Sequence, residues 1–381
     1  MIRVEVRPEM LRWARERAKL TIPHLERPFP KIERWEKGEA SPTLKQLERL
    51  AKATHVPIGY LFLTEPPIER IPIPDFRTME PGLRKEPSPN LLEMLYVCQQ
   101  RQAWYRDFAK AAGEEPPGFV GSATILDSVE AVALKMRQTL NFDLDARRAC
   151  PSWTEALRQF IAQADAAGAL IMCSGVVLNN NRRRLDPMEF RGFVMADDLA
   201  PLVFINGADT KAAQMFTLAH ELAHLWLGQS ALSDAGPSKL PDHQIERWCN
   251  RVAAELLVPI SVIQSEIRHE GELGEEIARL ARYFKVSTLV ILRRIYDIGV
   301  LSREEFGEAY ESELRRLRAL PKGKGGDFYL TQAARVSKRF ARGLVESALE
   351  GQTLFRDAFR LLGIGKVETF HELARNLGFF S

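Results

Sequence analysis

The spacing of apolar residues changes twice along the chain and predicts helical ends around a short β-rich middle. Apolar positions at helical spacing predict helices at 9–19, from residue 44 after the start signal Ser41-Pro-Thr43, from residue 57, at 90–112, 128–140 and 153–167. Continuous apolar runs then predict strands at 169–178, 190–196 and 202–206, and the tight connection at 197–201 indicates that the last two pair antiparallel. Helical spacing returns at 211–227 and 245–259 and continues beyond residue 261. There the stretch 273–297 predicts a helix, a short turn and a second helix capped by Ser287, in a helix-turn-helix-like pattern. We therefore expect a mostly helical α+β protein with a small, about three-stranded, mainly antiparallel sheet.

Proline-rich sequence separates the first helices from the rest of the chain. Seven prolines lie between residues 66 and 90, which favours extended structure and excludes a continuous helix. The predicted divisions are a helical module at 1–65, a linker at 66–90, a domain with the strands at 91–264, and a helical module at 265–381. Within the linker, Asp75-Phe-Arg-Thr78 combines charge with an aromatic ring and is predicted to pack the linker onto a neighbouring element.

The helix at 211–227 carries the chemistry that the other elements surround. His220 and His224 are four positions apart, so both ring nitrogens can reach one metal ion from the same helical face. A zinc ion held this way keeps a position for water, and the carboxylate of Glu221 can accept the proton of that water. Two histidines at this spacing can also occur by chance, so a third ligand is required.

The helix at 245–259 offers two candidates for that ligand. Glu246 has Asn250 four positions later, on the same face, where the amide can hydrogen-bond the free nitrogen of a metal-bound histidine. Glu255 is the alternative, and we favour Glu246 because of Asn250. Cys249 is expected to be a small core residue, since a thiolate would add charge and close the water position. His243 is the nearest candidate to stabilise an oxyanion, with an ordinary surface histidine as the alternative.

These two helices together resemble the ImmA/IrrE family of bacterial metallopeptidases. The resemblance lies in Phe216-Thr-Leu-Ala-His-Glu-Leu-Ala-His-Leu225 and in Ile245-Glu-Arg-Trp-Cys-Asn-Arg-Val-Ala-Ala-Glu-Leu-Leu-Val-Pro259. It implies a zincin-like domain, zinc ligands at His220, His224 and Glu246, a general base at Glu221, and cleavage of a repressor protein. An extended substrate would pair with an edge strand, for which 190–196 and 202–206 are the candidates.

Nucleic-acid binding is a second hypothesis, centred on the two ends of the chain. The phrase from Ile32 to Thr43 resembles the second half of a phage-repressor helix-turn-helix, with Lys31 and Arg34 as candidate duplex contacts. Only 14 residues lie between Leu20 and Trp35 (35 − 20 − 1), so the first helix of the pair must be short, and protein docking or dimerisation is equally compatible. Residues 314–342 hold nine Lys or Arg against one Asp. A solvated surface is the default interpretation of such a run, and single-strand nucleic-acid contacts by Arg335, Lys338 and Arg339 are the alternative.

Composition indicates the cellular compartment more clearly than it indicates the function. A net charge of +3 is too small to indicate nucleic-acid binding by itself. The 4 cysteines form no Cys-x-x-Cys pair, and no signal peptide or membrane span is evident, so we expect a cytoplasmic protein in a reducing compartment. The hypotheses are a zinc endopeptidase acting on a repressor or antitoxin, a DNA-binding regulator with a non-catalytic metal site, and an effector of a toxin–antitoxin or phage-defence pair. A homodimer is compatible with each.

Overall fold

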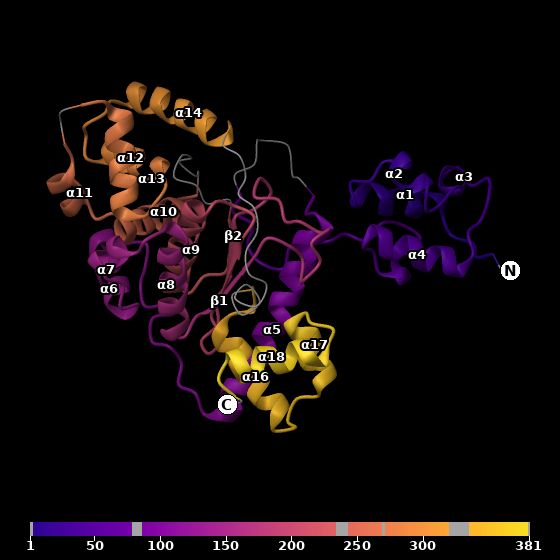
Figure 1. Ribbon diagram of the computed structural model, residues 1–381. Coiled ribbons are helices and arrows are strands. Elements are labelled where there is room, and N and C mark those ends of the chain that lie inside the picture. Colours follow the sequence, from indigo (N-terminus) through magenta and orange to yellow (C-terminus); the bar gives the residue numbers. More distant parts are fainter. Residues whose placement is uncertain (1–2, 78–85, 234–242, 269–270, 320–334, 380–381) are drawn as a thin grey trace. The chain divides into compact units, whose positions relative to one another are not determined.

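The computed structural model describes residues 3–77, 86–233, 243–268, 271–319 and 335–379, and it forms two compact units (Figure 1). The first unit contains residues 1–72 and 82–95, and the second contains residues 73–81 and 96–381. The linker is thus divided, because Ile73 begins a segment that belongs to the second unit. The basic stretch at 320–334 lies outside the described residues.

The first unit is a small helical module with an apolar core that includes Leu11, Ile32, Trp35 and Leu50. Its helices are α1 (Pro8–Arg17), α2 (Ile22–Glu26), α3 (Ile32–Glu36), α4 (Leu44–Thr54) and the 3₁₀ helix η1 (Ile58–Phe62). Thr43 caps α4 in a reciprocal capping box with Gln46, as the start signal at 41–43 predicts. The helix pair that resembles a repressor is short on both sides, since α2 and α3 have five residues each. At 1.5 Å per residue α3 is only about 7.5 Å long.

The second unit holds the predicted strands between helices. Its elements are α5 (Pro89–Ala112, which begins in the first unit), α6 (Val129–Thr139), α7 (Leu144–Ala149), α8 (Trp153–Ala166), β1 (Leu170–Ser174), β2 (Gly192–Met195), β3 (Leu202–Asn206), α9 (Lys211–Trp226), β4 (Ala231–Ser233), α10 (Gln244–Leu257), α11 (Ile260–Glu266), α12 (Leu273–Phe284), α13 (Thr288–Asp297), α14 (Arg303–Ala319), α16 (Lys338–Leu349), α17 (Phe355–Leu362) and α18 (Val367–Asn376). The prediction of a mostly helical α+β fold is confirmed. No helix in the described ranges is both long enough and apolar enough to cross a bilayer.

The sheet has one strand more than the sequence predicts, and its order is β1-β3-β2-β4. β1 pairs parallel with β3, whereas β2 pairs antiparallel with both β3 and β4. The fourth strand is only three residues long and follows the His-Glu helix, so its apolar pattern is too short to identify from sequence. The expectation that 190–196 or 202–206 forms an edge is wrong, because β2 and β3 are both interior strands.

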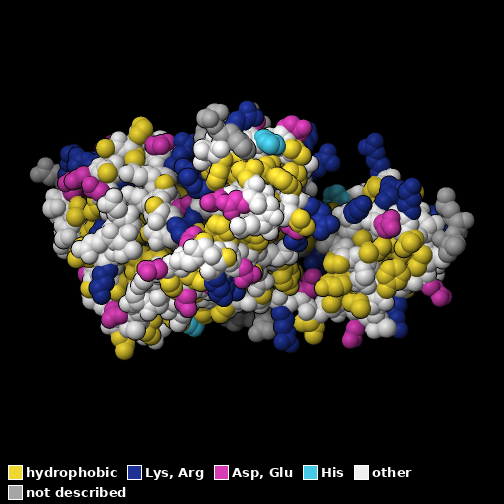
Figure 2. Space-filling model, turned by 90° about the horizontal axis from the view of Figure 1, so that it is seen from below, with side chains coloured by type: hydrophobic (Ala, Val, Ile, Leu, Met, Phe, Trp, Pro, Cys, Tyr) yellow, Lys and Arg dark blue, Asp and Glu magenta, His cyan; other side chains and the backbone are white. Residues whose placement is uncertain are grey.

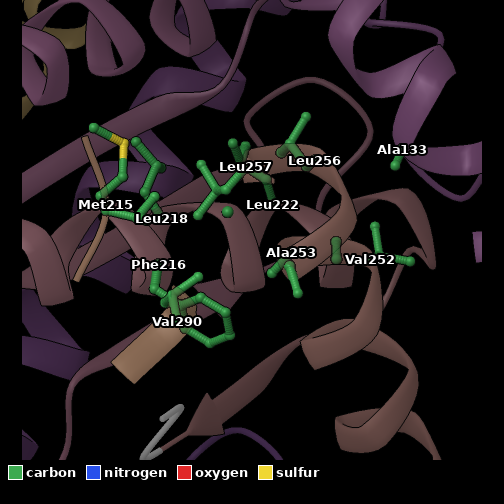
Figure 3. Close-up of a cluster of buried hydrophobic side chains, with 14 of the residues drawn as sticks. Ala133, Met215, Phe216, Leu218, Leu222, Val252, Ala253, Leu256, Leu257 and Val290 are labelled. Carbon is green, nitrogen blue, oxygen red and sulfur yellow. The ribbon is translucent and has the colours of Figure 1, made fainter. Parts of the chain in front are cut away.

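Both faces of the sheet are covered, which explains the continuous apolar runs. Ile171, Val194 and Val203 belong to the large core formed with α8, α9 and α10. Met172 points to the other face, where Cys98 and Arg101 of α5 contact its sulfur. Figure 3 shows part of the large core, in which apolar side chains of α9 and α10 interdigitate. The site helices are therefore held by packing along most of their length.

The two helices of the helix-turn-helix pattern at 273–297 pack against the large core. Ser287 caps α13 by accepting a hydrogen bond from the Val290 backbone N–H, as predicted. The buried residues of α13 occupy more than one side of the helix: Leu289, Val290, Ile291, Leu292, Arg294 and Ile295. A helix buried to this extent has too little free surface to read a DNA groove.

Candidate metal and catalytic site

Three side chains from α9 and α10 converge on one point. His220 and His224 lie one turn apart on α9, with Nε2 atoms 3.2 Å from each other. The carboxylate of Glu246, in the first turn of α10, reaches both: 3.2 Å to His220 Nε2 and 2.9 Å to His224 Nε2. All three side chains are buried. Among the described residues, they form the group whose ligand atoms lie close enough together to share a metal ion.

The spacing of these atoms fits tetrahedral zinc. Ligand atoms about 2.0–2.1 Å from a tetrahedral ion are about 3.3 Å from one another. The three separations of 2.9–3.2 Å approach this value. Two imidazoles and one carboxylate also form a donor set that zinc takes in hydrolytic sites, where it keeps one position for water. The residues present therefore fit zinc.

The charges at the site are arranged for a cation. Burial lowers the pKa of His220, but Glu246, Glu221 and Asn250 together outweigh burial and raise this pKa above its usual value. Burial dominates at His224 and lowers its pKa, although Glu246 opposes this effect. The pKa of Glu246 is held far below the ordinary range by the two imidazoles, which together overcome its burial. A buried carboxylate that stays ionised beside two imidazoles provides a negative charge for a divalent cation.

Asn250 lies beside His220, as the spacing predicts, and its amide contributes to the raised pKa of that imidazole. Neither Asn250 Oδ1 nor His220 Nδ1 has a hydrogen-bond partner of ordinary geometry among the described residues. Both atoms are buried, so a small rotation of the amide would pair them and fix the tautomer that presents Nε2 to a metal.

Glu221 lies on the same helix, and residues of the sheet fix the position of its carboxylate. Ser233 of β4 donates a hydrogen bond from its hydroxyl to Glu221 Oε1 at 2.5 Å, and Glu221 Oε2 is buried without a partner among the described residues. A Cβ at Gly192 of β2 would lie 2.9 Å from Glu221 Oε1 and 2.7 Å from Thr217 Cγ2, so only glycine fits here. Burial raises the pKa of Glu221 to about 8, and the charge of a bound divalent cation would oppose this shift.

Ser233 escapes sequence analysis, because nothing local distinguishes it from other serines. We expect Ser233→Ala to lower kcat about 10- to 100-fold with little change in KM, since a hydrogen bond to a charged group contributes about 1.5–3 kcal/mol. Zinc content should stay at one ion per chain, because Ser233 contacts no candidate ligand. Steady-state kinetics beside metal analysis tests this, and an unchanged kcat would show that the hydroxyl does not position Glu221.

The rival ligands from the sequence have other partners. Glu255 forms a buried ion pair with Arg294 of α13, and its carboxylate also accepts a hydrogen bond from the Ile260 backbone N–H. Cys249 is fully buried, and burial raises the pKa of its thiol well above the usual value. A thiol held protonated is a poor metal ligand, which agrees with its predicted place in the core.

His243 precedes α10 and contacts Phe76, a linker residue that the sequence predicts only to pack on a neighbouring element. Its ring lies 4.6 Å from the ring of Phe76, centroid to centroid. Phe76 is also nearly parallel to the ring of His224, at 7° and 6.2 Å. The linker residue Phe76 thus borders the candidate metal site. A role for His243 in stabilising an oxyanion stays a prediction.

Two of the candidate nucleic-acid contacts are engaged within the chain. Arg335 donates to Asn179 Oδ1 at 2.6 Å, and Arg339 pairs with Glu114 at 2.6 Å and donates to the hydroxyl of Tyr105. Lys31, Arg34 and Lys338 are exposed. On the face in Figure 2, basic side chains are interspersed with acidic ones. DNA binding therefore stays a prediction, carried by the exposed residues.

Comparison with known proteins identifies two segments. Residues 167–296 match the model of an IrrE N-terminal-like domain, and residues 336–376 match a domain of unknown function. The radiation response metalloprotease IrrE of Deinococcus radiodurans is 36% identical over 91 residues, covering 23% of this chain and 28% of the relative. Its counterpart in Deinococcus deserti is 35% identical over 118 residues, covering 27% and 42%. The chain thus spans less than half the length of these relatives, and the matched domain contains the three converging side chains.

Proposed function

Residues 167–296 of this chain belong to the ImmA/IrrE family of metallopeptidases, and from this premise we propose that the protein is a zinc-dependent endopeptidase that cleaves a partner protein. The observation that carries the proposal is the convergence of His220, His224 and Glu246 next to Glu221, whose carboxylate accepts a hydrogen bond from Ser233 through one oxygen and keeps the other unpaired among the described residues. A purely structural zinc site would not need a buried carboxylate next to its ligands.

The chemistry follows from the positions of these side chains. Zinc held by the two histidines and Glu246 would supply a Lewis acid that acidifies water and polarises a peptide carbonyl. Glu221 accepts the proton of the attacking water at its free Oε2 and then delivers it to the leaving amine. Ser233 holds the other oxygen of Glu221 during this transfer. Peptide hydrolysis is balanced by one water and needs no other reactant.

The substrate is proposed to be a transcriptional repressor or an antitoxin, whose cleavage would control stress, mobile-element or defence genes. The family resemblance supports this substrate class. Small repressor-like proteins encoded beside this gene are the first candidates to test.

Metal removal tests the proposal directly. Dialysis against a chelator should abolish cleavage of the candidate partner, and one equivalent of zinc should restore it, because both imidazoles and Glu246 are needed to hold the ion. Thermal stability should fall on removal, since zinc binds only the folded chain. Mass spectrometry of the products measures cleavage. Cleavage that persists in chelated protein with no bound metal would contradict the proposal.

A further inference from the structure

The sheet edge nearest the candidate site is occupied by the chain itself. Leu232 of β4 donates its N–H to the Pro74 carbonyl and accepts from the Phe76 N–H, both at 2.9 Å, so residues 74–76 pair parallel with this strand. The next residue along β4 is Ser233, whose hydroxyl holds Glu221. With β2 and β3 inside the sheet, the outer side of β4 is where an extended peptide could pair close to Glu221.

The side chains of this segment are fixed at the same place. Phe76 lies against the rings of His224 and His243, and it packs on the edge of the large core. Asp75 and Arg77 form a two-pronged ion pair at 2.7 and 2.9 Å, and Arg77 is buried and donates to the Glu189 carbonyl. We call Pro74–Arg77 the edge segment.

The edge segment makes the interactions that a bound peptide would make. It contributes backbone hydrogen bonds to a strand and places one aromatic side chain beside a candidate metal ligand. Its pairing consists of a single bridge, and the ring of Phe76 is only partly buried. A short pairing of this kind can be exchanged for an equivalent one by another extended chain.

We propose that the outer edge of β4 is the docking site for the extended chain of the substrate, and that the edge segment occupies it as a resident competitor. Phe76 fills the subsite beside His224 and His243 that a substrate residue takes. This inference rests on the proposed peptidase function. It assigns the substrate class as an extended segment with an aromatic or large apolar side chain at that subsite, and cleavage requires the edge segment to leave.

A binding experiment tests the docking site without cleavage. The probe is a fluorescent synthetic peptide with the sequence of residues 71–77, Ile-Pro-Ile-Pro-Asp-Phe-Arg. In full-length protein carrying Glu221→Gln, the further change Phe76→Ala should tighten peptide binding at least about tenfold, because the resident competitor loses its anchor. The same peptide with alanine in place of phenylalanine should bind at least about tenfold more weakly. Equal affinity of both proteins for the probe would overturn the proposal.

Cleavage provides the second readout. In the otherwise native protein, Phe76→Ala should raise kcat/KM for the partner about tenfold, and the free peptide should inhibit this variant competitively. A lower kcat/KM with unchanged zinc would make Phe76 a fixed wall of the site and overturn the proposal. Asp75→Ala is the second variant, because Asp75 is exposed and its loss removes the ion pair that holds Arg77 in the edge segment; it should change both readouts in the same direction.

The two arms separate this inference from the proposed function. Peptide binding that depends on Phe76, in a protein that cleaves no candidate partner, would leave the docking site standing and contradict the peptidase function. Zinc-dependent cleavage that neither Phe76→Ala nor Asp75→Ala changes would support the peptidase function and contradict the docking site.

Discussion

Glu221→Gln is expected to lower kcat for cleavage of the partner about 10²- to 10⁴-fold while one zinc ion per chain stays bound. Glutamine has nearly the same shape as glutamate, and its carbonyl oxygen can still accept the hydrogen bond from Ser233. It cannot accept a proton from water at neutral pH, so general-base catalysis is lost, which is worth a factor of this size. His220, His224 and Glu246 keep their positions because none of them depends on a hydrogen bond from Glu221.

The measurement pairs single-turnover cleavage with elemental analysis of the same samples. Ser233→Ala is the matched control, since it keeps the carboxylate and should lose only the smaller factor given above. A Glu221→Gln protein that retains zinc and the full biological effect would contradict catalysis by this site. In that event a DNA-binding regulator with a non-catalytic metal becomes the better hypothesis, and DNA binding measured across salt concentrations would test it.

Glu246→Ala is expected to weaken zinc binding by more than about 100-fold and to abolish cleavage. Loss of a residue that only supports a ligand costs about 10- to 100-fold in metal affinity, and removing a ligand should cost more. The two histidines would remain one turn apart on α9, but two imidazoles alone leave the ion under-coordinated and the buried site short of negative charge.

Glu255→Ala is the matched control, because it removes the same side chain nine positions later on the same helix (255 − 246). Zinc should be retained at one ion per chain. Stability should instead fall by about 3–5 kcal/mol, since Arg294 would be left buried without its partner, with both side chains under a tenth exposed. Zinc titration and thermal melting of both variants separate the two roles. Zinc loss in Glu255→Ala with retention in Glu246→Ala would transfer the ligand role to Glu255.

Local sequence patterns were enough to predict most of the helices and the two histidines at the centre of the site. Helical spacing and caps such as Thr43 and Ser287 depend on neighbours within one or two turns, so sequence predicts them well. The same geometry places His220 and His224 on one face before any tertiary contact is known. The resemblance to the ImmA/IrrE family is confirmed for residues 167–296, while the helix-turn-helix reading of the first unit stays a prediction.

Other features depend on contacts between residues far apart in the chain. The order of the strands in the sheet is such a feature. The residues of a strand do not show whether it has a neighbour on one side or on both, so the prediction about the edge strands was wrong. The partner of Arg339 is a second such feature. The basic residues around it in the sequence indicate nucleic-acid binding, whereas the structure pairs its guanidinium with Glu114, 225 residues earlier in the chain.

The sequence by itself determined the prediction of hydrolytic chemistry, because His220, Glu221 and His224 lie within one turn of one helix. The tertiary structure decided everything that reaches this turn from elsewhere. It brought Glu246 rather than Glu255 to the histidines, Ser233 to Glu221, and Phe76 to the face of His224. The physical reason is that spacing within a helix is fixed by the backbone, whereas the approach of a second element is fixed by the packing of the whole core.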